Sequence, residues 1–148
     1  MNGPAISVKA AEPKQFERIR ALLDDARLPT RDLAPSSVDG FLVATDAQEV
    51  IGAVALERYG NVGLLRSLVV TPRRKGEGFG KAMVHALEER ARAEGIESLV
   101  LLTETAKDFF AALGYRVGQR AAASVAVQAS SEFAYVCPAS AVYMEKPL

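Results

Sequence analysis

The sequence predicts an α/β protein with a mixed central sheet and helices on both faces of that sheet. Three features indicate this class. Segments 41–46 and 50–60 read as a β-hairpin, and 63–70 follows at once as a third strand. Two longer stretches repeat apolar residues at helical spacing. Segment 98–102 is short and wholly apolar, which is typical of a strand buried between covering helices.

The remaining elements follow from the same periodicity and from glycine or proline at their ends. Phe16, Ile19 and Leu22 recur at helical spacing, and Gly95 is a suitable end for the second helix. In chain order, we expect a strand at 6–9, a helix at 12–27, a loop or short helical turn at 28–37, the three strands, a helix at 81–95, the strand at 98–102, a helix at 105–115, an irregular or helical tail, and a final strand at 141–146.

Composition bounds the class of protein. The 148 residues favour one domain over 1–148, with 49% apolar and 24% charged residues. Eighteen basic residues balance eighteen acidic ones, so no net charge draws the chain to nucleic acid or to a membrane surface. The first residues lack the layout of a signal peptide. Cys137 is the single cysteine, which excludes an internal disulfide and a cysteine-rich metal site. We therefore expect a cytoplasmic protein without a metal.

The stretch TPRRKGEGFGKAM at 71–83 is the most distinctive in the chain. It lies between a predicted strand and a predicted helix, where backbone N–H groups have no internal partner. Glycines let such a turn curl around an anion, and basic residues surround it. A pyrophosphate would fit this pattern. The glycines are Gly76, Gly78 and Gly80, and the basic residues are Arg73, Arg74, Lys75 and Lys81.

Other interpretations of this stretch are weighed against the anion cradle. A flexible surface loop with solvated charges would have the same composition. The GxxxxGK[ST] motif of P-loop NTPases is absent. No first βα turn is followed by a ribose-binding acid, so a Rossmann dinucleotide site is not indicated.

Two motifs in order resemble those of the GCN5-related N-acetyltransferase (GNAT) family. The first is a strand, then [QR]-x-x-G-x-[GA], then a long helix. It fits as Arg73-x-x-Gly76-x-Gly78 or as Lys75-x-x-Gly78-x-Gly80, and the spacing after Pro72 favours the second. The second motif is AKDFFAALGY at 106–115. The resemblance covers essentially the whole chain and implies the GNAT fold.

The resemblance also implies acetyl-CoA as co-substrate. It places the glycines on the pyrophosphate and the strand backbone before them along the pantetheine arm, as an added strand would lie. The residues it assigns to acetyl-CoA are Leu68, Val69, Val70, Lys75, Gly76, Glu77, Gly78, Phe79, Gly80 and Lys81.

The tail SSEFAYVCPASAVYMEK, with LPTRDL, ERYG and LLRSL, is similar to small acetyltransferases associated with arsenic resistance, of the arsinothricin N-acetyltransferase type. These are similar in turn to the acetyltransferase module of N-acetylglutamate synthases. The resemblance implies a glutamate-like amino acid as acceptor.

Arg66 is the candidate for binding the carboxylate of such an acceptor, because Arg pairs with carboxylates in a bidentate manner. Strand alternation would put Arg66 on the same face as Leu68. An Arg at a solvent-facing sheet edge is the other interpretation. Ser67 and Arg31 are further substrate-binding candidates, although Ser67 would point the other way and Arg31 lies in a loop.

Acetyl transfer needs a neutral amine, a stabilised oxyanion and often a proton for the leaving thiolate. Glu57 is the first candidate for the base and Glu132 the second. By resemblance, the Leu68 backbone N–H stabilises the oxyanion. Phe110 stands where many family members have a tyrosine acid, which leaves Tyr115, Tyr135 or a water as the donor, or no donor.

Two rival functions stay open at this point. One is acetylation of another amine, such as a polyamine, an aminoglycoside or a protein N-terminus. The other is an acyl-CoA-binding module that regulates a partner without catalysis. The tail is also a candidate for packing across a homodimer.

Overall fold

The computed structural model describes residues 7–148, apart from the side chain of Tyr135. It contains seven strands and four α-helices in these described residues. In chain order they are β1 (Ser7–Ala10), α1 (Phe16–Asp25), β2 (Phe41–Asp46), β3 (Glu49–Tyr59), β4 (Val62–Val70), α2 (Phe79–Ala93), β5 (Ser98–Thr103), α3 (Lys107–Ala112), β6 (Arg116–Val117), α4 (Val125–Gln128) and β7 (Val142–Pro147).

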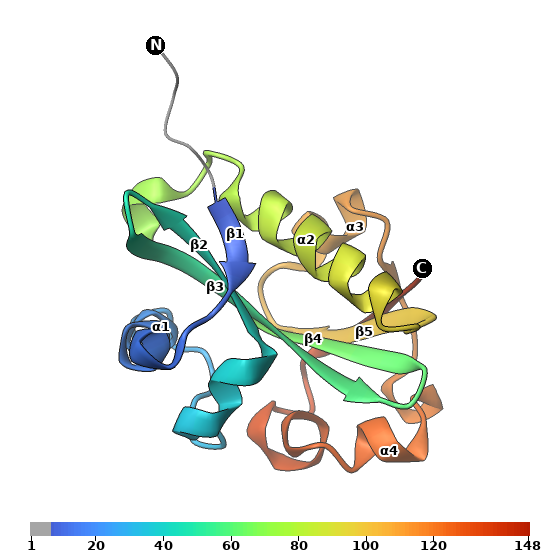
Figure 1. The fold of residues 1–148 in the computed structure, drawn as a ribbon. Coiled ribbons are helices and arrows are strands. Elements are labelled where there is room, and N and C mark those ends of the chain that lie inside the picture. Colours follow the sequence, from blue (N-terminus) through green and yellow to red (C-terminus); the bar gives the residue numbers. More distant parts are fainter. Residues whose placement is uncertain (1–6) are drawn as a thin grey trace.

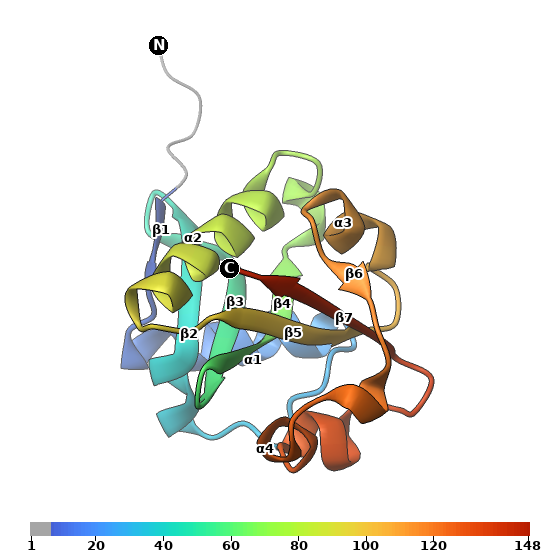
Figure 2. The same ribbon diagram turned by 90° about the vertical axis from the view of Figure 1, so that its right-hand side faces the viewer.

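The strands form one mixed sheet in the order β1-β2-β3-β4-β5-β7-β6 (Figures 1 and 2). Only β4 and β5 run parallel, and they pair over a short distance, from Val62 opposite Ser98 to Leu64 opposite Val100. Both strands continue beyond this point without pairing with each other, while β4 stays paired with β3 and β5 with β7. The sheet is therefore split along the second half of β4, and the β4 backbone there has no neighbour on its β5 side.

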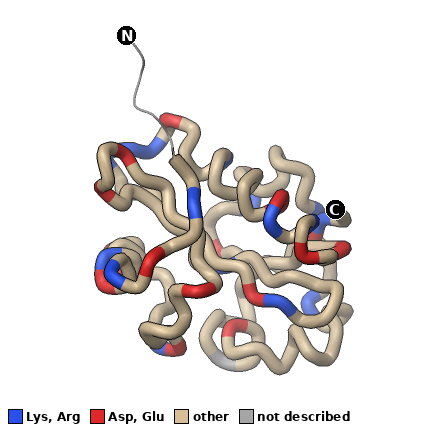
Figure 3. Tube along the Cα trace, viewed as in Figure 1, with Lys and Arg blue, Asp and Glu red and all other residues tan. Residues whose placement is uncertain are grey.

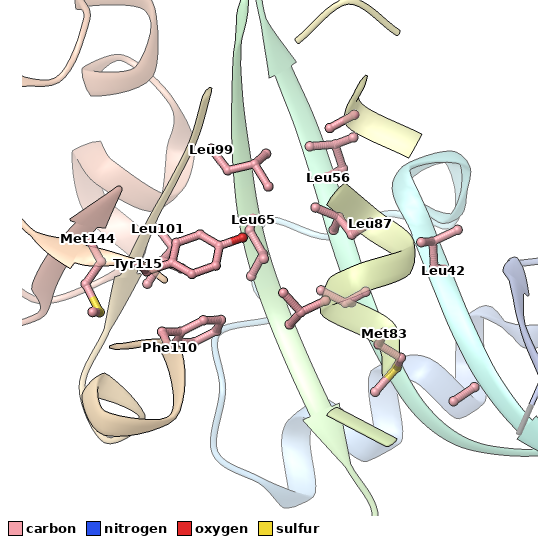
Figure 4. Close-up of a cluster of buried hydrophobic side chains, with 14 of the residues drawn as sticks. Leu42, Leu56, Leu65, Met83, Leu87, Leu99, Leu101, Phe110, Tyr115 and Met144 are labelled. Carbon is pink, nitrogen blue, oxygen red and sulfur yellow. The ribbon is translucent and has the colours of Figure 1, made fainter. Parts of the chain in front are cut away.

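Helices cover both faces of the sheet (Figure 1). The α2 and α3 helices lie over one face, where the largest apolar cluster includes Leu65, Met83, Leu87 and Phe110 (Figure 4). The other face is covered in two parts. The α1 helix packs on β2, β3 and β4 through a cluster that includes Ile19, and the tail packs on β4, β5 and β7 through clusters that include Val127.

The predicted fold class is confirmed, and most predicted elements lie within a few residues of those observed. The strand predicted at 6–9 corresponds to β1, and Ile6 lies outside the described residues. Two differences stand out. The two-residue strand β6 is not predicted, because so short a segment carries no periodicity. In the tail, Glu132–Val136 forms a π-helical turn, a rare local structure.

Acidic and basic residues are interspersed along the trace (Figure 3). Across residues 7–148, no helix is both long and apolar enough to cross a bilayer.

Candidate active site

A bulge interrupts β4 at the point where the sheet splits. The ladder with β3 passes from Ala55 opposite Arg66 to Ala53 opposite Val69, so Ser67 and Leu68 have no β3 partners of their own. Ser67 has a φ of 60°, a left-handed conformation that is uncommon for residues other than glycine. The Leu68 backbone thus has no register partner on β3 or β5, and it lies at the gap between β4 and β5, where a donor to a developing oxyanion would need to be.

The bulge interrupts the alternation of side chains along β4, so Arg66 and Leu68 do not lie on the face expected from their spacing. Leu68 packs against the α2-side cluster, whereas Arg66 pairs with carboxylates on the opposite side. The left-handed Ser67 adds one residue to the strand, which moves the next side chain to the other face. The prediction that Arg66 and Leu68 share a face is wrong.

The turn that follows β4, Lys75–Lys81, is called the glycine turn below. Gly76 has a φ of 84° and Gly78 a φ of 90°, which only glycine adopts readily. A Cβ at either position would meet no atom within 4 Å, so the space beside them is open. Gly80 is needed for another reason, because its Cβ would lie 3.3 Å from the Phe109 ring. Gly78 is the N-cap of α2, whose first N–H groups are therefore close to this open space.

The basic residues around the glycine turn differ in what they contact. Arg73 pairs with Glu49. Arg74 pairs with Asp46 at 2.9 Å and with Glu77 at 3.1 Å, and it stacks on the Phe79 ring. Lys75 and Lys81 are exposed and form no ion pair within residues 7–148. The two lysines, rather than the two arginines, are thus available to an anion in the turn.

A cavity of about 1000 Å³ runs from the glycine turn along the split between β4 and β5. Nine of the ten residues assigned to acetyl-CoA line it: Leu68, Val69, Val70, Lys75, Gly76, Gly78, Phe79, Gly80 and Lys81. The tenth, Glu77, is instead held by Arg74. Arg66, Ser67 and Glu132 line the same cavity. The split edge of β4 therefore connects the glycine turn with the charged residues at the bulge.

Arg66 is enclosed by three carboxylates, and these four residues are called the Arg66 cluster below. Its guanidinium donates to the Asp32 carboxylate at 2.5 and 3.0 Å and to the Glu57 carboxylate at 3.3 Å. Glu132 lies 3.4 Å from its Nε. The Arg66 side chain has 0% exposure. An acceptor carboxylate could reach this guanidinium only by displacing one of its partners, and the substrate-binding role of Arg66 stays a prediction.

The two candidate bases have different surroundings. Glu57 accepts a hydrogen bond from the Tyr59 hydroxyl at 2.7 Å and one from Arg66, and it is not among the residues that line the cavity. Glu132 lines the cavity and is 4% exposed. Burial raises the pKa of Glu132 to about 7, with a contribution from the charges of Glu57 and Asp32, while the Arg66 charge opposes the shift.

The Tyr115 hydroxyl is not placed to act as a proton donor. Tyr115 is buried outside the cavity, where its hydroxyl donates to Glu88 at 2.9 Å. It packs edge-to-face on Phe110, and Figure 4 shows both rings within the α2-side core. The side chain of Tyr135 is outside the described part of the chain. Cys137 lines the cavity, but burial and the Glu132 charge raise the pKa of its thiol to about 12, so it is a poor donor to a thiolate.

Arg31 lies in a second, smaller cavity of about 440 Å³. This cavity and the larger one share Arg27, Leu28, Pro29 and Glu104, so the two adjoin at the loop after α1. Asp32 of the same loop is a partner of Arg66 that the sequence does not reveal. A single acid in a loop is ordinary, and only the fold brings it to an arginine 34 residues away. Arg27, with a φ of 59°, likewise carries no signal in the sequence.

Comparison with known proteins agrees with this geometry. The model of the Acetyltransferase (GNAT) family matches residues 8–115. An IAA acetyltransferase of Azospirillum brasilense is 34% identical over 65 residues, which are 43% of this chain and 42% of that protein. The chain therefore covers less than half the length of this relative.

Solved structures share the fold over nearly the whole chain. One is N-acetylglutamate synthase from Neisseria gonorrhoeae complexed with coenzyme A and N-acetyl-glutamate, with a TM-score of 0.85 and 17% identity over 99% of this chain and 36% of that one. Another is Rv2747 from Mycobacterium tuberculosis in complex with CoA and NLQ, with a TM-score of 0.83 and 23% identity over 96% of this chain and 99% of that one.

The chain belongs to the Acetyltransferase (GNAT) family, since the family model covers most of it. The predictions of the family and of the fold class are confirmed. The predicted co-substrate agrees with the coenzyme A bound in both structural neighbours.

Proposed function

We propose that this protein transfers the acetyl group of acetyl-CoA to the amine of a small amino acid with an acidic side chain. One observation carries the proposal. A single cavity joins the glycine turn, the unpaired β4 backbone at Leu68 and the buried Glu132. These are a place for a pyrophosphate, a donor for an oxyanion and a carboxylate near the reacting amine, which are the parts that acetyl transfer needs.

The acidic acceptor has separate support. Arg27 and Arg31 line the adjoining cavity at the loop after α1, where an acceptor side chain could approach. The structural neighbour from Neisseria gonorrhoeae, an N-acetylglutamate synthase, is complexed with N-acetyl-glutamate. The tail resembles arsinothricin N-acetyltransferases, so arsinothricin and phosphinothricin are test substrates beside glutamate. In this proposal Ser67 and Arg31 contact the acceptor, and Arg66 does so only if Asp32 moves away.

The Arg66 cluster also favours a second candidate. Three carboxylates share one guanidinium, and the surplus negative charge suits a cationic acceptor such as a polyamine. The first candidate function needs an acceptor with an acidic side chain, and the second needs a cationic acceptor. A single assay distinguishes the two.

Release of the CoA thiol is measured with glutamate, phosphinothricin, arsinothricin, spermidine and an aminoglycoside as acceptors. We expect turnover confined to the glutamate-like acids. Turnover with spermidine alone would support the cationic acceptor instead. If no amine is acetylated while acetyl-CoA still raises the melting temperature, the chain is a binding module and the proposed function is wrong.

A further inference from the structure

Glu132 has an oxygen that the protein leaves without a partner. Its Oε1 is fully buried and accepts no hydrogen bond of normal geometry from the described residues, and the Cys137 thiol, a weak donor, lies against the same carboxyl. A buried acceptor in this state destabilises the folded protein and calls for an explanation. A ligand that donates a hydrogen bond to Oε1 would supply the missing partner. Glu132 lines the cavity, so such a ligand has a route to it.

The backbone at Glu132 is also unusual. The residue begins the π-helical turn Glu132–Val136, whose first residue is joined to Cys137 by a backbone hydrogen bond of 3.0 Å. Single π-helical turns are frequently found at functional sites. The turn sets the Glu132 carboxylate beside Arg66, on the side of β4 that faces α1 and the tail.

Glu57 differs from Glu132 in both respects. Its two carboxylate oxygens already accept hydrogen bonds from Tyr59 and Arg66. It also lies outside the set of residues that line the cavity. Glu57 is therefore suited to hold Arg66 in place rather than to meet a substrate.

We propose that Glu132 is the proton acceptor for the attacking amine, and that Arg66, with Asp32 and Glu57, is the positioning group that keeps its carboxylate in the cavity wall. The assignment rests on the proposed function. The substrate ammonium gives one proton to Glu132, and the neutral nitrogen forms a bond to the acetyl carbonyl carbon. The C–S bond then breaks, the second nitrogen proton goes to the CoA thiolate, and Glu132 releases its proton to water.

The groups that face Glu132 come from several elements. Arg66 of β4 is the cation among them, and Glu57 of β3, Asp32 of the loop after α1 and the Cys137 thiol of the tail are the others. Burial raises the pKa of Glu132 most, and the charges of Glu57 and Asp32 raise it further. The Arg66 charge and a hydrogen bond from Cys137 lower it, and the resulting pKa is about 7. A base with such a pKa is half ionised at neutral pH and can both take up and release a proton there.

The test compares Glu132→Gln with Glu57→Gln by the pH dependence of kcat on an accepted amine. Wild-type kcat should rise through an acid limb centred near pH 7, because the base must be ionised. Glu132→Gln should lose about 100-fold or more in kcat together with this limb, and keep its Michaelis constant for acetyl-CoA. Glu57→Gln should keep the limb, whatever its effect on the rate.

A second measurement reports on Glu132 without turnover. Because the folded-state pKa of Glu132 lies above its usual value, the folded state binds the proton more tightly, and stability falls as pH rises from about 4.5 through 7. The melting temperature of the wild type should fall over this range, and that of Glu132→Gln should fall less. Gln removes one of three carboxylates, so Arg66 keeps two ionised partners and the variant should fold.

The outcomes separate this assignment from the proposed function. An acid limb that survives in Glu132→Gln, or parallel melting profiles for that variant and the wild type, would overturn the role of Glu132 alone. Absence of turnover by the wild type with every amine would overturn the proposed function and this assignment together.

Discussion

The glycine turn and the Arg66 cluster contribute to the same cavity but are assembled from different distances along the chain. The glycine turn is seven consecutive residues that run from the loop after β4 into the first residues of α2, and its shape comes from left-handed glycines within it. The Arg66 cluster joins residues from β3, β4, the loop after α1 and the tail. The glycine turn is a local structure. The Arg66 cluster forms only when α1 and the tail have packed on the same face of the sheet.

The two regions also differ in how they treat charge. In the glycine turn, two exposed lysines without ion pairs leave positive charge for a ligand. In the Arg66 cluster, a buried arginine is engaged by carboxylates and the surplus charge is negative. This contrast suits a protein that binds a polyanionic co-substrate at one place and an ammonium group at another.

Removing the charge at the centre of the cluster should have the largest effect on stability. Arg66→Met keeps an unbranched apolar side chain but leaves three carboxylates without their cation. We expect a loss of about 3–5 kcal/mol in the free energy of unfolding, because a broken buried ion pair strands the remaining charges. Arg73→Met is the matched control, since Arg73 is 65% exposed and pairs only at the surface. Its loss should be below about 1 kcal/mol.

Urea denaturation at neutral pH measures both losses. An Arg66→Met variant that is as stable as Arg73→Met, and impaired only in its Michaelis constant for the acceptor, would show that Arg66 binds substrate rather than the neighbouring carboxylates.

A bulky residue in the glycine turn should weaken the binding of acetyl-CoA and leave the Arg66 cluster unchanged. Gly78→Val puts a side chain into the open space of the turn and strains a φ of 90°. Gly60→Val is the control, because Gly60 has a φ of 68°, has equally open surroundings and lies outside the cavity. We expect similar losses of stability in both variants, and a rise of about 100-fold or more in the dissociation constant for acetyl-CoA in Gly78→Val alone.

Isothermal titration with acetyl-CoA checks this prediction. Equal affinities in the two glycine variants would mean that the turn is a surface loop and does not hold the pyrophosphate.

The same contrast explains how far the sequence predicts the molecule. The order of strands and helices is predicted because periodicity and end signals are local, as Gly95 at the end of α2 illustrates. The residues assigned to acetyl-CoA come from one contiguous motif. Nine of the ten line a single cavity, and their role in binding stays a prediction. Asp32 is not predicted, because a loop acid acquires a partner only through tertiary packing. The Ser67 bulge is not predicted either, and it puts Arg66 and Leu68 on opposite faces of the sheet.

Glu132 is predicted in part from the sequence and depends in part on tertiary packing. The sequence supplies it as a second candidate for the base, through the resemblance of the tail. Its burial, its unpartnered oxygen and its raised pKa come from a π-helical turn packed beside β4. The spacing of apolar residues does not predict such a turn, because a π-helical turn interrupts the regular helical repeat.

Phe110→Tyr should have the smallest effect and would sharpen the account of the leaving group. Phe110 lines the cavity and is 4% exposed, so an added hydroxyl meets a packed site and costs about 1–3 kcal/mol of stability. We expect unchanged affinity for acetyl-CoA and a change in kcat below about tenfold, because the second nitrogen proton already supplies the thiolate. Steady-state kinetics at saturating acceptor measures the change. A rise in kcat of tenfold or more, within the range of general acid catalysis, would show that the thiolate leaves without a proton in the wild type and that protonation limits the rate.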